Sequence, residues 1–151
     1  MAVFKDGKMT GSLDNEDTMG YIWSMGNVRY CDVDVLDKDG KAVFNITKLK
    51  CKREVTINKQ GKVKTVFNVN ATLASNEIIG FEKMKPDKLR DHLIALSEKE
   101  IENRILHCVN SAQDLKADIF GIGTSLYREY PEEYKKMKKN WENIFADAEF
   151  E

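Results

Sequence analysis

The stretch KAVFNITKLKCKREVTI, residues 41–57, decides the fold, because its apolar residues alternate as in a strand and change parity halfway. Phe44 and Ile46 stand at even positions, whereas from Leu49 onward the apolar side chains stand at odd positions. Alternation with a period of two predicts a β-strand with one buried face. An extra residue re-aims every later side chain, so the parity change predicts a bulge near residues 47–48.

Further strands are predicted on both sides of this one. A short strand at residues 3–4 precedes an Asp-Gly turn, and residues 28–36 alternate before the hairpin turn at 38–40. After a second turn at 58–61, another strand places one set of residues on a single face: Val63, Thr65, Phe67, Val69, Ala71 and Leu73. The pattern predicts an antiparallel meander with one solvated side.

The remaining segments have helical periodicity. A short helix over residues 14–25 is predicted to end at Gly26, and a long one spans residues 86–116. Asp118 caps a second helix after it, and Pro131 opens a third at its first turn. We therefore expect one α+β domain over residues 1–151, with the long helix and the two shorter ones packed on one face of the sheet.

Charge is balanced overall but uneven along the chain. Lys and Arg number 24 against 25 Asp and Glu, which argues against a dedicated nucleic-acid binder. Residues 41–64 nonetheless carry eight basic residues against Glu54 alone. This block is either a solvated face that protects the sheet from aggregation or a docking surface for an acidic partner or anionic lipid headgroups. The possible interaction surface comprises Lys48, Lys50, Lys52, Lys62 and Lys64.

No set of residues predicts catalysis, a metal or a cofactor. His92 and His107 lie on one helix, more than about 20 Å apart along its axis, so they cannot share a metal ion. The glycines of 121–123 lack the third glycine of a dinucleotide fingerprint, and the acidic residues of 32–40 lack the closing Glu of a calcium loop. The cysteines lack C-x-x-C spacing and are expected to be buried thiols: Cys31, Cys51 and Cys108.

Three runs in the second half of the chain resemble a known family. They read ADIFGIG over residues 117–123, LYREYPEEY over 126–134 and WENIF over 141–145. Together with VFKDGK over 3–8, they closely resemble the C-terminal domain of the Ger(x)C family, the GerAC-like C subunits of bacterial spore germinant receptors. The resemblance covers essentially the whole chain.

The resemblance implies a function that the residues alone do not. Family members are lipoproteins with two further domains before this one, so the chain is expected to be an excised domain. They are non-enzymatic subunits, lipid-anchored on the outer face of the spore inner membrane, and they work with integral membrane A and B subunits when nutrient germinants are sensed. We therefore expect an interaction domain without a cofactor, whose basic block or whose helix over 118–130 contacts another subunit or the membrane. The alternative is a domain that binds the germinant or another small molecule.

The family motif is expected to serve packing. Its residues are Asp118, Phe120, Gly121, Gly123, Tyr130, Pro131 and Trp141. The glycine pair favours close packing of helices, because glycine lets another backbone approach. Lys116 stands where the family often has glycine, which argues against a left-handed helix cap there. The family usually continues into a last strand ending in a basic stretch, whereas this chain stops at Phe150-Glu151.

Overall fold

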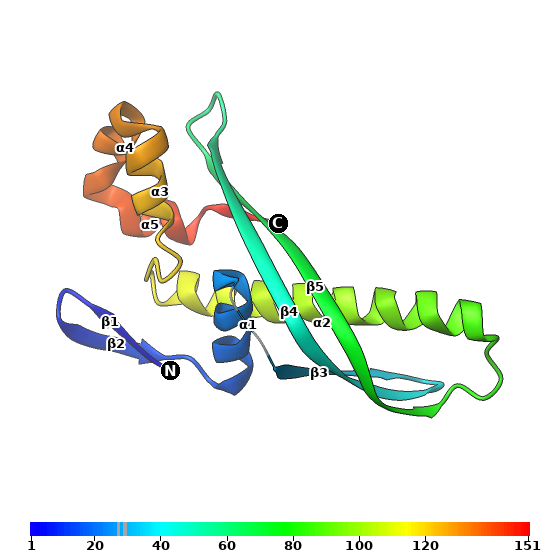
Figure 1. Cartoon of the computed structure of the whole chain (residues 1–151). Helices are drawn as coiled ribbons and strands as arrows, with labels where there is room; N and C mark the ends of the chain where they lie inside the picture. The colour runs from blue at the N-terminus through cyan, green and yellow to red at the C-terminus, as the bar shows by residue number, and fades with distance from the viewer. Residues whose placement is uncertain (27, 29) are drawn as a thin grey trace.

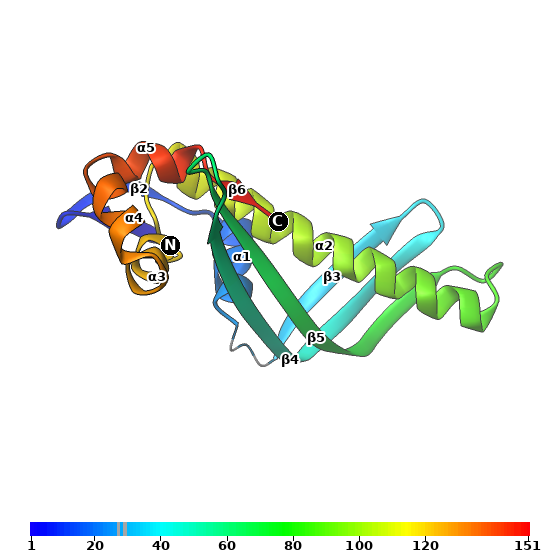
Figure 2. The same ribbon diagram turned by 90° about the horizontal axis from the view of Figure 1, so that it is seen from above.

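A computed structural model describes residues 1–26, 28 and 30–151 (Figure 1). Four strands form one sheet in the order β3-β4-β5-β6, and β1 and β2 form a separate two-stranded sheet. The long helix α2 runs along one face of the larger sheet, and the short C-terminal helices gather at one end (Figures 1 and 2). The predicted α+β fold, with its helices on one face, is confirmed.

A long hairpin forms the middle of the sheet. Strands β4 (Gly40–Ile57) and β5 (Val63–Gly80) pair antiparallel along their whole length. In the turn between them the Asn58 side chain accepts hydrogen bonds from two backbone N–H groups, at 2.9 Å each. Strand β5 extends beyond residue 73, the last of the alternating residues predicted to share one face. Residues 74–80 lack alternation, but they still pair with the first residues of β4.

The bulge predicted from the parity change is confirmed. Ile46 pairs with Leu73 and Lys48 pairs with Thr72, so the intervening residue has no partner on β5. The bulge keeps the core continuous, because Ile46 is 0% exposed and Leu49 is 2% exposed although one is even and the other odd.

The two outer strands of the sheet are short. Strand β3 (Cys31–Asp37) pairs antiparallel with β4, and it begins later than predicted. Residue 29, which belongs to the strand predicted over residues 28–36, lies outside the described residues. Strand β6 (Glu149–Phe150) runs parallel to β5, which corrects the expectations of a purely antiparallel meander and of a chain that stops before a last strand. Two residues are too few to show alternation, so the sequence pattern could not predict this strand.

The N-terminal segment forms the hairpin that its turn residues favour. Strands β1 (Ala2–Lys5) and β2 (Lys8–Ser12) are joined through Asp6 and Gly7, whose φ angles are 49° and 76°. Helix α1 (Asn15–Met25) follows, as predicted. The Asp14 side chain accepts the Asp17 N–H at 2.8 Å at its start.

The long helix ends in a conformation that the sequence argued against. Helix α2 spans Pro86–Asp114, two residues short of the predicted end. Lys116 has a φ of 50°, and the next N–H, that of Ala117, reaches back to the Ala112 carbonyl at 3.0 Å. The expectation against a left-handed cap is therefore wrong. The Lys116 ammonium donates to Asn143 Oδ1 at 2.7 Å, a contact that glycine could not make.

The last helical segment is more broken than predicted. It consists of α3 (Ile122–Glu129), α4 (Pro131–Met137), the 3₁₀ turn η1 (Lys138–Asn140) and α5 (Trp141–Ala146). The single helix expected after Pro131 is thus interrupted by a tighter turn, which changes the direction in which later side chains point. Trp141 and Phe145 consequently face the rest of the molecule, and Phe145 is fully buried.

Two apolar clusters hold the layers together. One lies between α1, α2 and the middle of the sheet and includes Trp23, Ile46 and Leu49. The other lies where α3 and α5 meet the end of the β4–β5 hairpin and includes Phe120 and Phe145. Phe67 packs against both clusters. The whole sheet therefore shares one buried face.

Polar contacts fix α2 relative to its neighbours. Two of them reach β3 and one reaches α1: His92–Asp37 (2.8 Å), Arg104–Asp34 (3.0 Å) and His107–Asp17 (2.8 Å). Each histidine thus contacts its own aspartate, at different ends of the helix. The hydrogen bond that His107 donates to the Asp17 carboxylate, followed by the negative charge of Asp17, raises the pKa of His107.

We expect the His107–Asp17 contact to make stability depend on pH. Because the pKa of His107 is raised from 6.5 on folding, its stabilisation is complete below pH 6.5 and is lost as the pH rises through the raised pKa. His107 is 58% exposed, so solvent screening limits the effect to about 1–3 °C in Tm. Thermal unfolding of His107→Gln and of the parent protein should differ at about pH 5.5 and converge at about pH 9. A difference that grows with pH would contradict this assignment.

Candidate interaction surfaces

A row of lysines lies on the face of the sheet opposite α2. Lys48, Lys50 and Lys52, here called the lysine face, occupy alternate positions of β4 after the bulge and are exposed. Across the hairpin they pair with three small polar residues of β5, namely Thr72, Asn70 and Asn68. Since the helices cover the other face, this one is open to a partner (Figures 1 and 2).

The basic block does not present all its charge to solvent. Three of the five predicted interaction residues pair with carboxylates: Lys52–Glu54 (2.9 Å), Lys62–Glu149 (2.6 Å) and Lys64–Glu151 (2.5 Å). These contacts raise the pKa of Lys52 and of Lys64 and lower that of Glu149. Within the described residues, only Lys48 and Lys50 of the five have no carboxylate within 4.0 Å. Sequence reasoning missed the pairing because two of the three acids, Glu149 of β6 and Glu151 just after it, come from the far end of the chain.

Arg53, which is also part of the basic block, contacts the backbone of the protein itself. It stands on the helix-facing side of β4, opposite Phe67, and its guanidinium donates a hydrogen bond to the Phe120 carbonyl. This contact ties the hairpin to the segment that leads into α3. On the strands of the block, the lysines without a carboxylate partner among the described residues are therefore Lys48 and Lys50, and Lys59 is a third in the hairpin turn.

The Asp118 side chain connects α3 to α5. Its carboxylate accepts hydrogen bonds from the N–H groups of Ile122 and Gly123, at 2.9 and 2.7 Å, and from Trp141 Nε1–H, at 3.1 Å. A carboxylate at a helix N-terminus satisfies N–H groups that lack partners within the helix. Asp118 thus caps α3 as predicted, but the helix begins at Ile122, later than the sequence indicated. We call Asp118, Gly123 and Trp141 the Asp118 cluster.

The two glycines of the motif have different roles. A Cβ on Gly123 would lie 2.8 Å from Trp141 Nε1, so glycine is needed there for close packing. Gly121 has a φ of 70°, and a Cβ built on it would meet nothing within 4 Å. The expectation that both glycines serve packing is therefore wrong for Gly121, which instead provides a left-handed residue before α3.

The other motif residues lie in the same region. Phe120 is 1% exposed and contacts the Phe67 ring edge-on, with centroids 5.6 Å apart. Tyr130 is partly buried against the same cluster, and Pro131 occupies the first turn of α4. The structure thus brings the motif together at the junction of α3, α4 and α5, where most of its residues are buried or half-buried.

The thiols and histidines form no reactive set. Cys108 is buried, whereas Cys31 and Cys51 are only half-buried, contrary to the expectation of three buried thiols. Burial raises the pKa of Cys108 to about 12 and also raises that of Cys51. Across residues 1–26, 28 and 30–151, no group of three His, Cys, Asp or Glu side chains could hold a metal ion.

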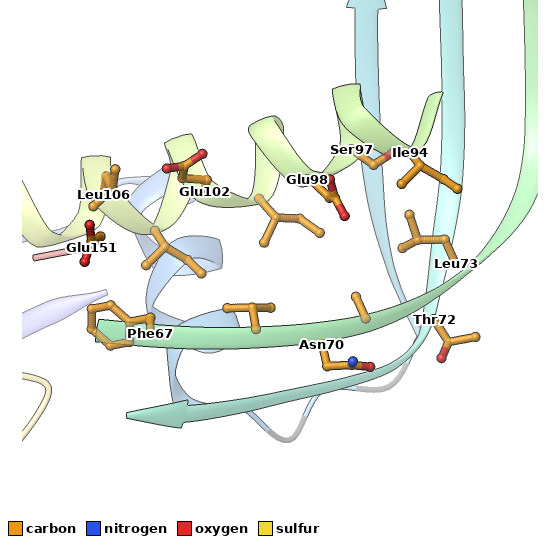
Figure 3. Close-up of a pocket in the computed structure, with 14 residues that line it drawn as sticks. Phe67, Asn70, Thr72, Leu73, Ile94, Ser97, Glu98, Glu102, Leu106 and Glu151 are labelled. Atoms are coloured by element: carbon orange, nitrogen blue, oxygen red, sulfur yellow. The ribbon is translucent and has the colours of Figure 1, made fainter. Parts of the chain in front are cut away.

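A groove of about 660 Å³ lies between α2 and the edge of β5 (Figure 3). Its floor is formed by the helix-facing side chains of β5: Phe67, Val69, Ala71 and Leu73. Its wall is the side of α2, with Ile94, Glu98, Glu102 and Leu106. Glu151 lies at the Phe67 end of the groove, and Ile94 lies at the Leu73 end. No sequence pattern predicted the groove, because the residues of its two sides separately look like parts of a strand and a helix.

Comparison with known proteins identifies relatives for the whole chain. The family model described as spore germination B3/GerAC-like, C-terminal, matches residues 1–151. Spore germination protein KC of Bacillus subtilis (strain 168) is 27% identical over 155 residues, which cover 96% of this chain and 36% of that protein. Spore germination protein B3 of the same organism is 24% identical over 150 residues, which cover 95% and 38%. The chain thus spans little more than a third of the length of these curated relatives.

A solved structure has the same fold. The crystal structure of the GerBC protein matches with a TM-score of 0.78 and 23% identity, over 99% of this chain and 47% of that one. In the described part of our chain, no helix has both the length and the apolar composition to cross a bilayer.

Alanine substitutions should separate the roles of the two glycines. Gly123→Ala should cost about 1–3 kcal/mol and change the Trp141 fluorescence, because the new methyl group displaces the indole ring from Asp118. Gly121→Ala should cost about 1–2 kcal/mol through backbone strain and leave that fluorescence unchanged. Chemical unfolding followed by fluorescence measures both effects. Equal spectral changes in the two variants would show that the packing assignment is wrong.

Proposed function

The chain belongs to the family of spore germination B3/GerAC-like C-terminal domains, and on this premise we propose that it is a non-enzymatic interaction domain of a germinant-receptor C subunit. It acts in nutrient-triggered spore germination. Its partners are the integral membrane A and B subunits of the receptor, together with the anionic membrane surface. The parent protein is lipid-anchored on the outer face of the spore inner membrane.

One observation carries the assignment of an interaction surface. Lys48 and Lys50 stand side by side on the helix-free face of the sheet, and neither has a carboxylate within 4.0 Å among the described residues. A lysine near an anionic lipid surface contributes on the order of 1 kcal/mol to binding. An anchored parent would keep the domain close to such a surface, so a small patch is sufficient for contact.

The helix over residues 118–130 is the less suitable contact surface. Ile122, Gly123 and Leu126 are buried, and they are needed to hold α3 against the rest of the protein. Tyr127 is the large hydrophobic side chain that α3 leaves exposed, at 64%. The motif therefore holds the terminal helices in place, and we assign the contact with a partner to the lysine face.

A small-molecule site is the second candidate, and the β5 groove is the feature that favours it. Its floor is apolar and its wall carries two carboxylates, which suits an amine-bearing ligand. Titration calorimetry with germinant amino acids and sugars measures such binding directly.

Charge reversal on the lysine face should weaken membrane binding. We expect Lys48→Glu/Lys50→Glu to reduce binding to phosphatidylglycerol-containing vesicles about tenfold or more at low salt, and the effect to fade at high salt. The matched control is Lys138→Glu/Lys139→Glu, which makes the same charge change on exposed lysines of η1. Equal losses in both variants would mean that net charge, and not the lysine face, determines binding. Vesicle flotation measures the bound fraction.

Germination itself tests the wider proposal. A parent protein from which this domain is deleted should fail to support nutrient-triggered germination. The full-length parent with Lys48→Glu/Lys50→Glu should support it more slowly. Loss of optical density after addition of nutrient measures the rate. A non-nutrient trigger that bypasses the receptor serves as the control. Normal nutrient germination without the domain would disprove the proposed function.

A further inference from the structure

Tyr30 is an exposed aromatic residue in a strained backbone conformation. Its φ is 61°, in the left-handed region that a bulky residue seldom adopts. Its side chain is 78% exposed, and it belongs to neither apolar cluster. Among the described residues, its ring pairs with no other aromatic ring and its hydroxyl group makes no hydrogen bond. Strain that such contacts do not offset is typical of positions with a function.

Tyr30 lies beside the bulge of β4. Its N–H donates to the Ile46 carbonyl at 2.9 Å, and Val28, two residues earlier, forms a β-bridge with Leu49. Lys48 lies between these two partners on β4, so the backbone of Tyr30 runs next to the first residue of the lysine face. Val28 and Leu49 point into the same apolar cluster, whereas the Tyr30 side chain remains outside it.

The sheet is bent, and the bulge contributes to the bend. One extra residue bends the strand that carries it. Figure 2 shows the β4–β5 hairpin curving around α2, which lies on the inside of the bend. Lys48 and Lys50 point away from α2, so they lie on the convex side of the sheet, and Tyr30 is exposed beside them. A flat surface that approaches this side meets the bend first.

The residue types at the bend suit the surface of an anionic bilayer. Tyrosine is enriched at membrane–water interfaces because its ring is apolar and its hydroxyl group is polar. Lysine carries its charge on a long apolar stem, which lets the ammonium group stay among the headgroups. Lys48 and Lys50 have no carboxylate within 4.0 Å among the described residues, so their charge is available to anionic lipids.

We propose that Tyr30 anchors the lysine face in the interface of an anionic bilayer. The Tyr30 ring inserts between lipid headgroups at the convex side of the bend, and Lys48 and Lys50 bind the headgroups around it. The left-handed conformation keeps this ring outside the apolar cluster, while Val28 and Cys31 on either side contact it. The inference rests on the proposed function of the lysine face, and it adds an apolar contact and an orientation of the domain at the membrane.

Flotation of the protein of residues 1–151 with vesicles of phosphatidylglycerol and phosphatidylcholine tests the inference. Tyr30→Gly should bind about threefold or more weakly than the parent protein, because an apolar contact is lost. The matched control is Tyr127→Ala, which removes a tyrosine that is 64% exposed on α3 and should leave binding unchanged. The loss in Tyr30→Gly should be similar at about 50 and about 150 mM salt, because salt screens charges and does not weaken the burial of a ring.

Two further measurements show whether the ring serves the membrane or the fold. Tyr30→Gly should not lower the Tm, since glycine adopts a φ of 61° without strain. In Tyr30→Trp, lipids brominated near the headgroup should quench the new tryptophan, beyond the quenching of Trp23 and Trp141 in the parent protein. Parental binding by Tyr30→Gly, an equal loss in Tyr127→Ala, a Tm lowered by several degrees, or no additional quenching would each overturn the inference.

The lysine variant separates this inference from the proposed function. Loss of vesicle binding in Lys48→Glu/Lys50→Glu, together with parental binding in Tyr30→Gly, would support the lysine face and overturn the role of Tyr30 alone. Parental binding in both variants would overturn the lysine face and the role of Tyr30 together.

Discussion

The structure depends on the burial of one face of a long, twisted hairpin under one long helix. Alternate side chains of β4 and β5 point toward α2, and the bulge after Ile46 preserves this arrangement where the parity of the sequence changes. Burial of an aliphatic side chain such as Leu49 stabilises the fold by about 1.5–3 kcal/mol. A shift of one residue in the strand register would therefore expose several such side chains at once. The helix caps, the polar contacts of α2 and the terminal helices all presuppose this register. The opposite face is left free to carry charge.

The parts of the fold that the sequence predicted are those governed by local patterns. Parity revealed the bulge, and Asp14 with Gly26 marked both ends of α1. The pairing of Lys62 with Glu149 and of Lys64 with Glu151 could not be predicted, because it joins distant segments and β6 is too short to show a period. Lys116 shows the limit of a propensity argument, since a side-chain contact to Asn143 accompanies a backbone conformation that lysine disfavours. The glycine pair shows a second limit, because the same residue type serves backbone freedom at one position and close approach at the other.

The candidate surfaces differ in how far residue type alone could identify them. Lysines at alternate positions of a strand predict an exposed face, and the structure retains Lys48 and Lys50 as its unpaired part. The family motif, which is the most recognisable sequence in the chain, is mostly internal and holds α3 to α5 through Asp118. In this chain, the most recognisable part of the sequence therefore identifies residues that hold the fold together. The groove beside β5, by contrast, exists only after α2 and the sheet have come together.

Phe67 belongs to both apolar clusters, and this has a consequence for how the molecule unfolds. Its ring contacts Phe120 and Phe150 on one side, while its strand carries the floor of the groove on the other. We therefore expect the two ends of the molecule to lose their packing together, so that amide exchange at α5 and at the middle of α2 would report a single cooperative unit.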